Sequence, residues 1–102
     1  MQLVLTGEII SAEEAHRVGL VNEVVAATEL IPRAEAIAQK IIANAPLAIQ
    51  YAMEAVNHGL NLTLAEGLYL EATLFGVCCA TEDKTEGTTA FLEKRAAVFK
   101  GK

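Results

Sequence analysis

The last quarter of the chain contains a lysine whose charge could bind an anion. After Thr81, a residue type that caps helices, apolar residues repeat at a helical spacing. This apolar stripe consists of Gly87, Ala90, Phe91 and Val98. Lys94 lies in the same stripe. A lysine there either extends its ammonium group to water beside an apolar face, or binds an anion that the chain itself does not supply.

The other reactive side chains do not form a pattern typical of a catalytic site. His16 and His58 fall near predicted helix ends, where a histidine is usually solvated or caps the helix. Glu66 and Glu71 are five residues apart, so they do not share a helix face well. Paired carboxylates that act as acid and base need one shielded cleft. Since the sequence also lacks a glycine-rich phosphate loop, a serine elbow and an HExxH motif, it does not predict a complete enzyme.

Cys78 and Cys79 are the only cysteines, and they are adjacent. Neighbouring residues of a helix point in different directions, so we expect no disulfide between them, and no metal-ligand spacing exists. They are interpreted as small hydrophobic residues. The sequence thus predicts no metal site, and the cysteine usage favours a reducing compartment, here taken as the cytoplasm.

Composition narrows the class of protein further. The 102 residues allow at most one domain, with 53% hydrophobic and 21% charged residues. A net charge of -5 argues against nucleic acid as a partner, since such binders usually carry a basic face. No apolar run approaches the roughly 18 residues of a membrane-spanning helix, and no secretory signal is recognised at the start. We therefore expect neither a nucleic-acid nor a membrane partner.

Capping residues and apolar spacing predict helices joined by short connections. The predicted helices cover residues 12–18, 29–43 after a cap at Thr28, 46–58, 64–79 and a last helix after Thr81. Ser11 with Glu14 and Thr63 with Glu66 have the spacing of capping boxes. The stretch LVNEVV, residues 20–25, is either a short strand or an extended connector.

The predicted helix 64–79 is apolar nearly all round, which is typical of a helix that is buried on every side. A chain of this length has too little material to enclose it. We therefore expect this helix to be covered by another part of a longer polypeptide or by another subunit.

Three stretches together resemble the crotonase superfamily and, within it, the enoyl-CoA hydratases. They are LVLTGEIISAEEAHRVGLVNEVV, IANAPLAIQYAMEAVNHG and FGVCCATEDKTEGTTAFLEKRAAVFKGK. The resemblance covers nearly every residue in order, and the last stretch favours the hydratases. It implies a mainly α fold: the C-terminal helical region, for trimerisation and as a lid, of a crotonase-like fold whose βα spiral core is absent from this chain.

The same resemblance implies a domain division and a role for the chain. Residues 1–27 would end the crotonase core, and residues 28–102 would form the C-terminal helical domain. The parent enzyme would hydrate trans-2-enoyl-CoA to 3-hydroxyacyl-CoA in fatty-acid oxidation, as a homo-oligomer that is a trimer or a dimer of trimers. Its catalytic glutamates would lie upstream, so this fragment would be inactive alone and have no catalytic residue.

Three residues match positions that contact substrate in the family. Phe75 resembles the aromatic residue that closes the acyl pocket, while Phe91 and Lys94 resemble a pair that meets the CoA moiety, with the lysine toward its phosphate or adenine end. The thioester would be the substrate, and no cofactor is implied. Two alternatives stay open. One is another acyl-CoA enzyme of the superfamily, namely a 3-hydroxybutyryl-CoA dehydratase, an isomerase or a hydrolase. The other is a non-catalytic helical assembly module.

Overall fold

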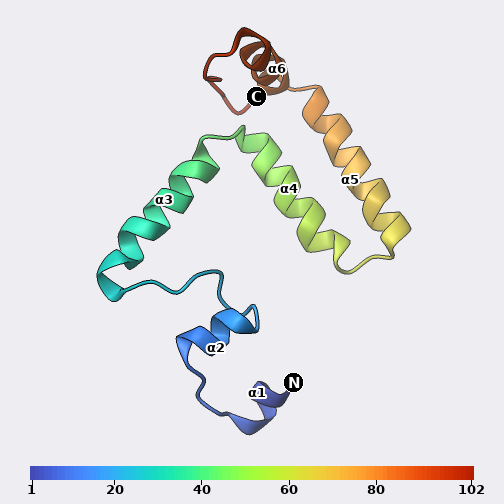
Figure 1. Ribbon diagram of the computed structural model, residues 1–102. Coiled ribbons are helices and arrows are strands. Elements are labelled where there is room, and N and C mark those ends of the chain that lie inside the picture. The colour runs from blue at the N-terminus through green and yellow to red at the C-terminus, as the bar shows by residue number, and fades with distance from the viewer. The chain divides into compact units, whose positions relative to one another are not determined.

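The computed structural model describes all 102 residues, and every regular element in it is a helix (Figure 1). The elements are α1 Gln2–Thr6, α2 Ala12–Arg17, the short 3-10 helix η1 Ala27–Glu29, α3 Leu30–Ile42, α4 Pro46–Gly59, α5 Leu64–Cys79 and α6 Glu82–Glu93. The chain divides into two units, Met1–Glu35 and Ala36–Lys102. Each unit is described by itself.

In the first unit, α1 was not anticipated, whereas α2 begins where the sequence predicts. The Ser11 hydroxyl accepts a hydrogen bond from the Glu14 backbone N–H at 3.2 Å, which caps α2. The Glu14 carboxylate instead accepts from the Arg17 guanidinium at 2.6 and 2.7 Å. Only half of the predicted capping box is therefore formed, and an ion pair within the helix takes the place of the other half.

Residues 20–25 form an irregular connector and not a strand: residues 20–22 are bends, where the Leu20 and Val21 N–H groups donate to the Ala15 oxygen at 2.8 and 3.4 Å, and residues 23–25 have no regular structure. Its Glu23 carboxylate accepts two hydrogen bonds from Arg33 of α3, at 2.5 and 2.6 Å. The predicted cap at Thr28 is wrong. Thr28 lies inside η1, which follows an extended Ala26 and has no side-chain cap, and α3 begins only at Leu30.

The second unit contains an antiparallel helix pair, α4 and α5 (Figure 1). Pro46 occupies the first turn of α4, where its missing N–H costs little. At the start of α5 the predicted capping box is confirmed: the Glu66 N–H donates to the Thr63 hydroxyl at 3.4 Å, and the Thr63 N–H donates to the Glu66 carboxylate at 3.0 Å. Gly59 and Gly67 bring the two backbones close together, since a Cβ on Gly67 would lie 3.7 Å from the Gly59 oxygen.

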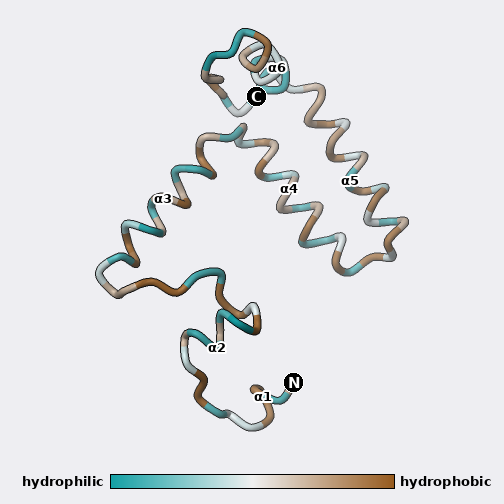
Figure 2. The backbone as a smooth tube through the Cα atoms, in the orientation of Figure 1, coloured by the Kyte–Doolittle hydropathy of each residue, from teal (hydrophilic) through white to brown (hydrophobic).

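Helix α5 has no buried residue. Leu64 is 80% exposed and Phe75 is 68% exposed. Figure 2 shows hydrophobic segments that alternate with hydrophilic ones in the joint between α4 and α5 and along α5. No single helix of the chain is long and apolar enough to cross a membrane; α5 and α6 taken together pass by length and composition only, and they meet at a 78° bend.

Helix α6 begins as predicted and ends earlier than predicted. The Thr81 hydroxyl accepts from the Lys84 N–H at 3.1 Å. The helix stops at Glu93, and Lys94 adopts a left-handed conformation with φ 54°. Val98 is therefore not in the helix, and the predicted helical stripe that includes Val98 and Lys94 is wrong.

The residues after Lys94 form a tail segment, 95–102, that folds back on α6. Asp83, only 2% exposed, accepts from the Lys100 and Gly101 N–H groups at 2.7 Å each. The Asp83 N–H donates to the Lys102 oxygen at 3.1 Å. The Phe99 ring covers Gly87, where a Cβ would lie 3.4 Å from the ring. Buried polar groups are normally paired, so Asp83 fixes the path of this tail segment.

Candidate functional site

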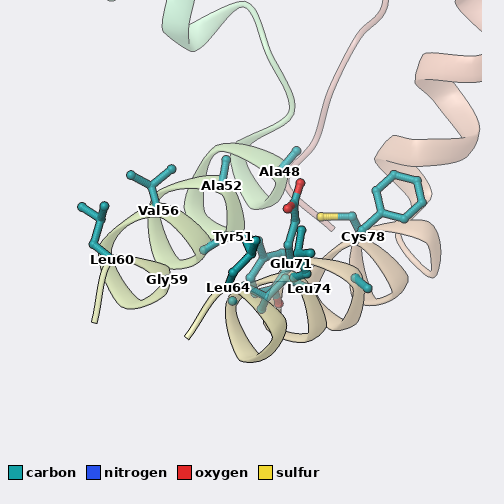
Figure 3. Close-up of a pocket in the computed structure, with 15 residues that line it drawn as sticks. Ala48, Tyr51, Ala52, Val56, Gly59, Leu60, Leu64, Glu71, Leu74 and Cys78 are labelled. Atoms are coloured by element: carbon teal, nitrogen blue, oxygen red, sulfur yellow. The ribbon is translucent and has the colours of Figure 1, made fainter. Parts of the chain in front are cut away.

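A groove of about 930 Å³ runs between α4 and α5 (Figure 3). Its walls are mostly apolar. They include Ala48, Tyr51, Ala52, Val56, Leu60, Leu64, Leu68, Leu74, Phe75 and Cys78. Phe75, one of the three predicted substrate contacts, is thus part of this wall. A groove of this size and lining suits an apolar chain or an apolar side of another protein segment.

Glu71 is the single carboxylate that lines the groove. Figure 3 shows its carboxylate directed from α5 into the space beside α4. Glu66, its candidate partner, is occupied elsewhere, because its carboxylate accepts from the Thr63 hydroxyl at 2.7 Å as well as from the Thr63 N–H. These hydrogen bonds lower the pKa of Glu66, so it is held ionised at the helix start. The two glutamates do not form an acid–base pair.

Phe91 and Lys94, the other two predicted contacts, lie together at the end of α6. The Phe91 side chain is 83% exposed, and Lys94 is exposed without an ion pair. The Lys94 N–H donates to the Phe91 oxygen at 3.3 Å. The two residues are close because of this tight turn, and not because they share a helix face. Phe75 lies apart from them, in the α4–α5 groove.

A network of hydrogen bonds joins charged residues before and after Lys94, and the sequence does not predict it. The Arg95 guanidinium donates to the Glu86 carboxylate at 2.6 and 2.9 Å and to the Glu93 carboxylate at 2.7 Å. The Glu86 carboxylate also accepts from the Val98 N–H at 2.8 Å. Hydrogen bonds from Arg95 and then from Val98 lower the pKa of Glu86 to about 2, and Glu86 in turn raises the pKa of Arg95.

The remaining reactive residues lie at helix ends or in the groove. His16 is in the last turn of α2 and His58 in the last turn of α4. Cys78 is half-buried in the groove wall, Cys79 is exposed, and both thiols are free. The second unit thus offers an apolar groove between α4 and α5 and, apart from it, an exposed lysine without an ion pair at the end of α6. These two features suit the apolar and the anionic parts of an amphipathic ligand.

Comparison with known proteins shows to which family the chain belongs. The enoyl-CoA hydratase/isomerase family model matches residues 1–102. The chain therefore belongs to the enoyl-CoA hydratase/isomerase family. It is 45% identical over 98 residues to a crotonyl-CoA hydratase of Syntrophomonas wolfei, covering 96% of this chain and 38% of that protein. It is 45% identical over 94 residues to a short-chain-enoyl-CoA hydratase of Clostridium acetobutylicum, covering 92% of this chain and 36% of that protein.

A solved structure shows the same helical arrangement. The chain superposes on an enoyl-CoA hydratase from Bacillus anthracis with a TM-score of 0.96 and 40% identity, covering 99% of this chain and 39% of that one. The recognition of this family from the three sequence stretches is confirmed. The chain spans under two fifths of the length of the two curated relatives above.

The fold assignment made from the sequence needs correction. It placed the chain in the C-terminal helical region of a crotonase-like fold. The family model instead matches from residue 1 to residue 102 and does not set a C-terminal region apart from a core. That assignment is therefore wrong as stated. What stands is a chain of helices, without strands, that corresponds to part of an enoyl-CoA hydratase/isomerase. The division at residue 27 stays a prediction.

Proposed function

We propose that the parent protein hydrates trans-2-enoyl-CoA thioesters to 3-hydroxyacyl-CoA. The observation that carries this proposal is the match over nearly the whole chain to proteins named hydratases, at 45% identity. In the proposal this chain supplies apolar surface for the acyl group, contacts to CoA and contacts between subunits. It supplies neither the acid nor the base of the reaction.

The chemistry of hydration explains this division of labour. Water adds its hydroxyl to C3 and a proton is added to C2, so the reaction needs a base for water, an acid for C2 and hydrogen-bond donors to the thioester oxygen. Glu66 caps α5, Glu86 binds Arg95 and Asp83 holds the tail segment, which leaves Glu71 as the only carboxylate in the groove. One carboxylate does not supply both the base and the acid that the reaction needs. The catalytic groups are therefore expected in the part of the parent that this chain does not span.

The proposed contacts form two groups, one for the acyl chain and one for the nucleotide of an acyl-CoA. Phe75 and its apolar neighbours in the groove suit the hydrocarbon chain. The exposed Phe91 ring suits the flat adenine, and the Lys94 ammonium suits a phosphate. The exposed apolar side chains of α5 suit a contact with the rest of the polypeptide or with another subunit of a cytoplasmic homo-oligomer.

A second candidate reaction is supported by the family's own description, which includes isomerases. An isomerase moves the double bond of the thioester and adds no water. The choice between the two reactions depends on acid and base groups that this chain does not contain.

The test is a chimera. The matched segment of the Bacillus anthracis hydratase is replaced by these 102 residues, a replacement that the TM-score of 0.96 makes feasible. We expect the chimera to hydrate crotonyl-CoA, as followed by loss of the conjugated double bond. We expect Phe75→Ala to raise the KM for longer acyl chains more than for crotonyl-CoA.

The control is Tyr69→Ala, which removes an exposed aromatic side chain of α5 that does not line the groove. A folded chimera that binds crotonyl-CoA but adds no water to it would refute the proposal that these 102 residues can serve as part of a hydratase. Equal effects of Phe75→Ala on short and long substrates would refute the acyl contact.

A further inference from the structure

The conformation of Lys94 is unusual for its residue type. It is the only residue other than glycine with a positive φ, at 54°. A left-handed residue just after a helix is usually glycine or asparagine, because a longer side chain is disfavoured there. A lysine keeps this conformation only where neighbouring contacts hold the backbone in place, and strain of this kind is common at functional sites.

Those contacts converge on Glu86. Its Oε1 accepts from the Arg95 Nη1 at 2.6 Å and from the Val98 N–H at 2.8 Å, and its Oε2 accepts from the Arg95 Nη2 at 2.9 Å. The Arg95 Nε donates to Glu93 at 2.7 Å. Arg95 and Val98, which follow Lys94, thereby bind the Glu86 carboxylate of α6 directly, and Glu93, which precedes Lys94, is linked to it through Arg95.

The same network leaves the Lys94 ammonium available. Glu93 precedes Lys94 in the chain, and Glu86 accepts hydrogen bonds from Arg95 and Val98, which follow it. Arg95 binds both carboxylates, with bidentate geometry that a lysine cannot match. Lys94 itself has no ion pair, so its charge is not neutralised from within the chain.

We infer that Glu86 is a positioning residue for recognition of the anionic end of the acyl-CoA: by holding Arg95 and the Val98 N–H, it fixes the left-handed turn that directs Lys94 toward the nucleotide phosphate. This inference rests on the proposed function, and it deepens that function by naming the group that controls specificity for the phosphate. Glu86 touches no substrate and acts only through the turn.

The experiment compares CoA with 3′-dephospho-CoA, which differs only by the phosphate. Both are titrated into the chimera by calorimetry, and KM and kcat are measured with the two crotonyl thioesters. A charge-assisted contact is expected to give roughly a tenfold preference for the phosphorylated ligand. Lys94→Ala should abolish this preference. Glu86→Gln should reduce it at least threefold, with kcat within about twofold of the unsubstituted chimera.

The matched control is Glu82→Gln, which removes an exposed carboxylate from the first turn of the same helix, 3.8 Å from Lys102. It should leave the preference unchanged. Once Lys94 is alanine, adding Glu86→Gln should cause no further loss, because the turn then has no ammonium group to direct. If Glu86→Gln unfolds the chimera, Arg95→Lys is measured instead. Lysine keeps the positive charge but cannot bind the carboxylate through two parallel N–H groups.

The results separate the two proposals. An unchanged preference in Glu86→Gln, or an additive double variant, would overturn the positioning role while the proposed reaction stands. Equal binding of CoA and 3′-dephospho-CoA by the unsubstituted chimera would also overturn the positioning role. A chimera that binds CoA with the expected preference but lacks hydratase activity would refute the proposed part of this chain in a hydratase and leave the positioning role in place.

Discussion

Replacing Lys94 by glycine should make the protein more stable and less able to bind CoA. The left-handed conformation at φ 54° costs an ordinary residue about 1–2 kcal/mol, and glycine does not incur this cost. Glycine loses about 0.5–1 kcal/mol more backbone entropy on folding. The net expectation for Lys94→Gly is a gain of about 0.5–1 kcal/mol in the free energy of unfolding.

Lys94→Ala separates the effect of the backbone conformation on stability from the effect of the ammonium group on CoA binding. It removes the same ammonium group but keeps the unfavourable conformation. In the chimera, both variants should lose CoA affinity to the same extent, whereas only the glycine variant should unfold at a higher temperature. A gain of this size corresponds to a rise of about 1–4 °C in the midpoint of thermal unfolding.

Two results would refute the reasoning. A glycine variant that is less stable than the unsubstituted chimera would show that the Lys94 side chain contributes packing that exceeds the cost of its conformation. Unequal losses of CoA affinity in the two variants would show that the backbone turn, and not only the ammonium group, meets the ligand.

The remaining predictions concern the helices and the charge network. Thr63→Ala should lower the free energy of unfolding by about 1 kcal/mol through loss of the cap of α5, and Thr63→Ser should restore it, as measured by urea unfolding. Gly76→Ala should raise it by about 1 kcal/mol, since no atom beyond the adjacent residues and backbone of its own helix lies within 4 Å of the added methyl group; destabilisation in the chimera would reveal a close neighbour outside this chain. Because the pKa of Glu86 falls from its ordinary 4.5 to about 2 on folding, its stabilising effect is complete above pH 4.5 and is lost as the pH falls toward 2. Thermal unfolding of Glu86→Gln should therefore depend less on pH across that interval than unfolding of the unsubstituted protein.

The helices of the second unit could be predicted because their signals are local. Pro46, Thr63 with Glu66, and Thr81 each act on a backbone group within three residues, so their spacing alone identifies a helix start. In the first unit the signals compete. The stretch around Thr28 contains a residue type that caps helices, yet the chain forms a 3-10 turn there.

The site was only partly predictable. The end of α6 lacks the glycine that usually marks a helix end, so the helical pattern was extended through Lys94. Asp83 and Glu86 lie in the first half of α6, where acidic residues are already favoured by the helix dipole. Nothing in the sequence shows that they also bind backbone groups 12 to 18 residues later.

The α4–α5 pair has a consequence for the order of folding. Only residues 60–63 separate the two helices, so their mutual contacts need a short loop closure. Contacts this close in sequence form within microseconds, whereas surfaces from distant parts of a chain or from other subunits meet more slowly. The apolar groove is therefore expected to form before any distant segment or other subunit could cover it. During that interval its exposed leucines would make the nascent protein a substrate for chaperones, and a high concentration of unassembled chains would favour aggregation.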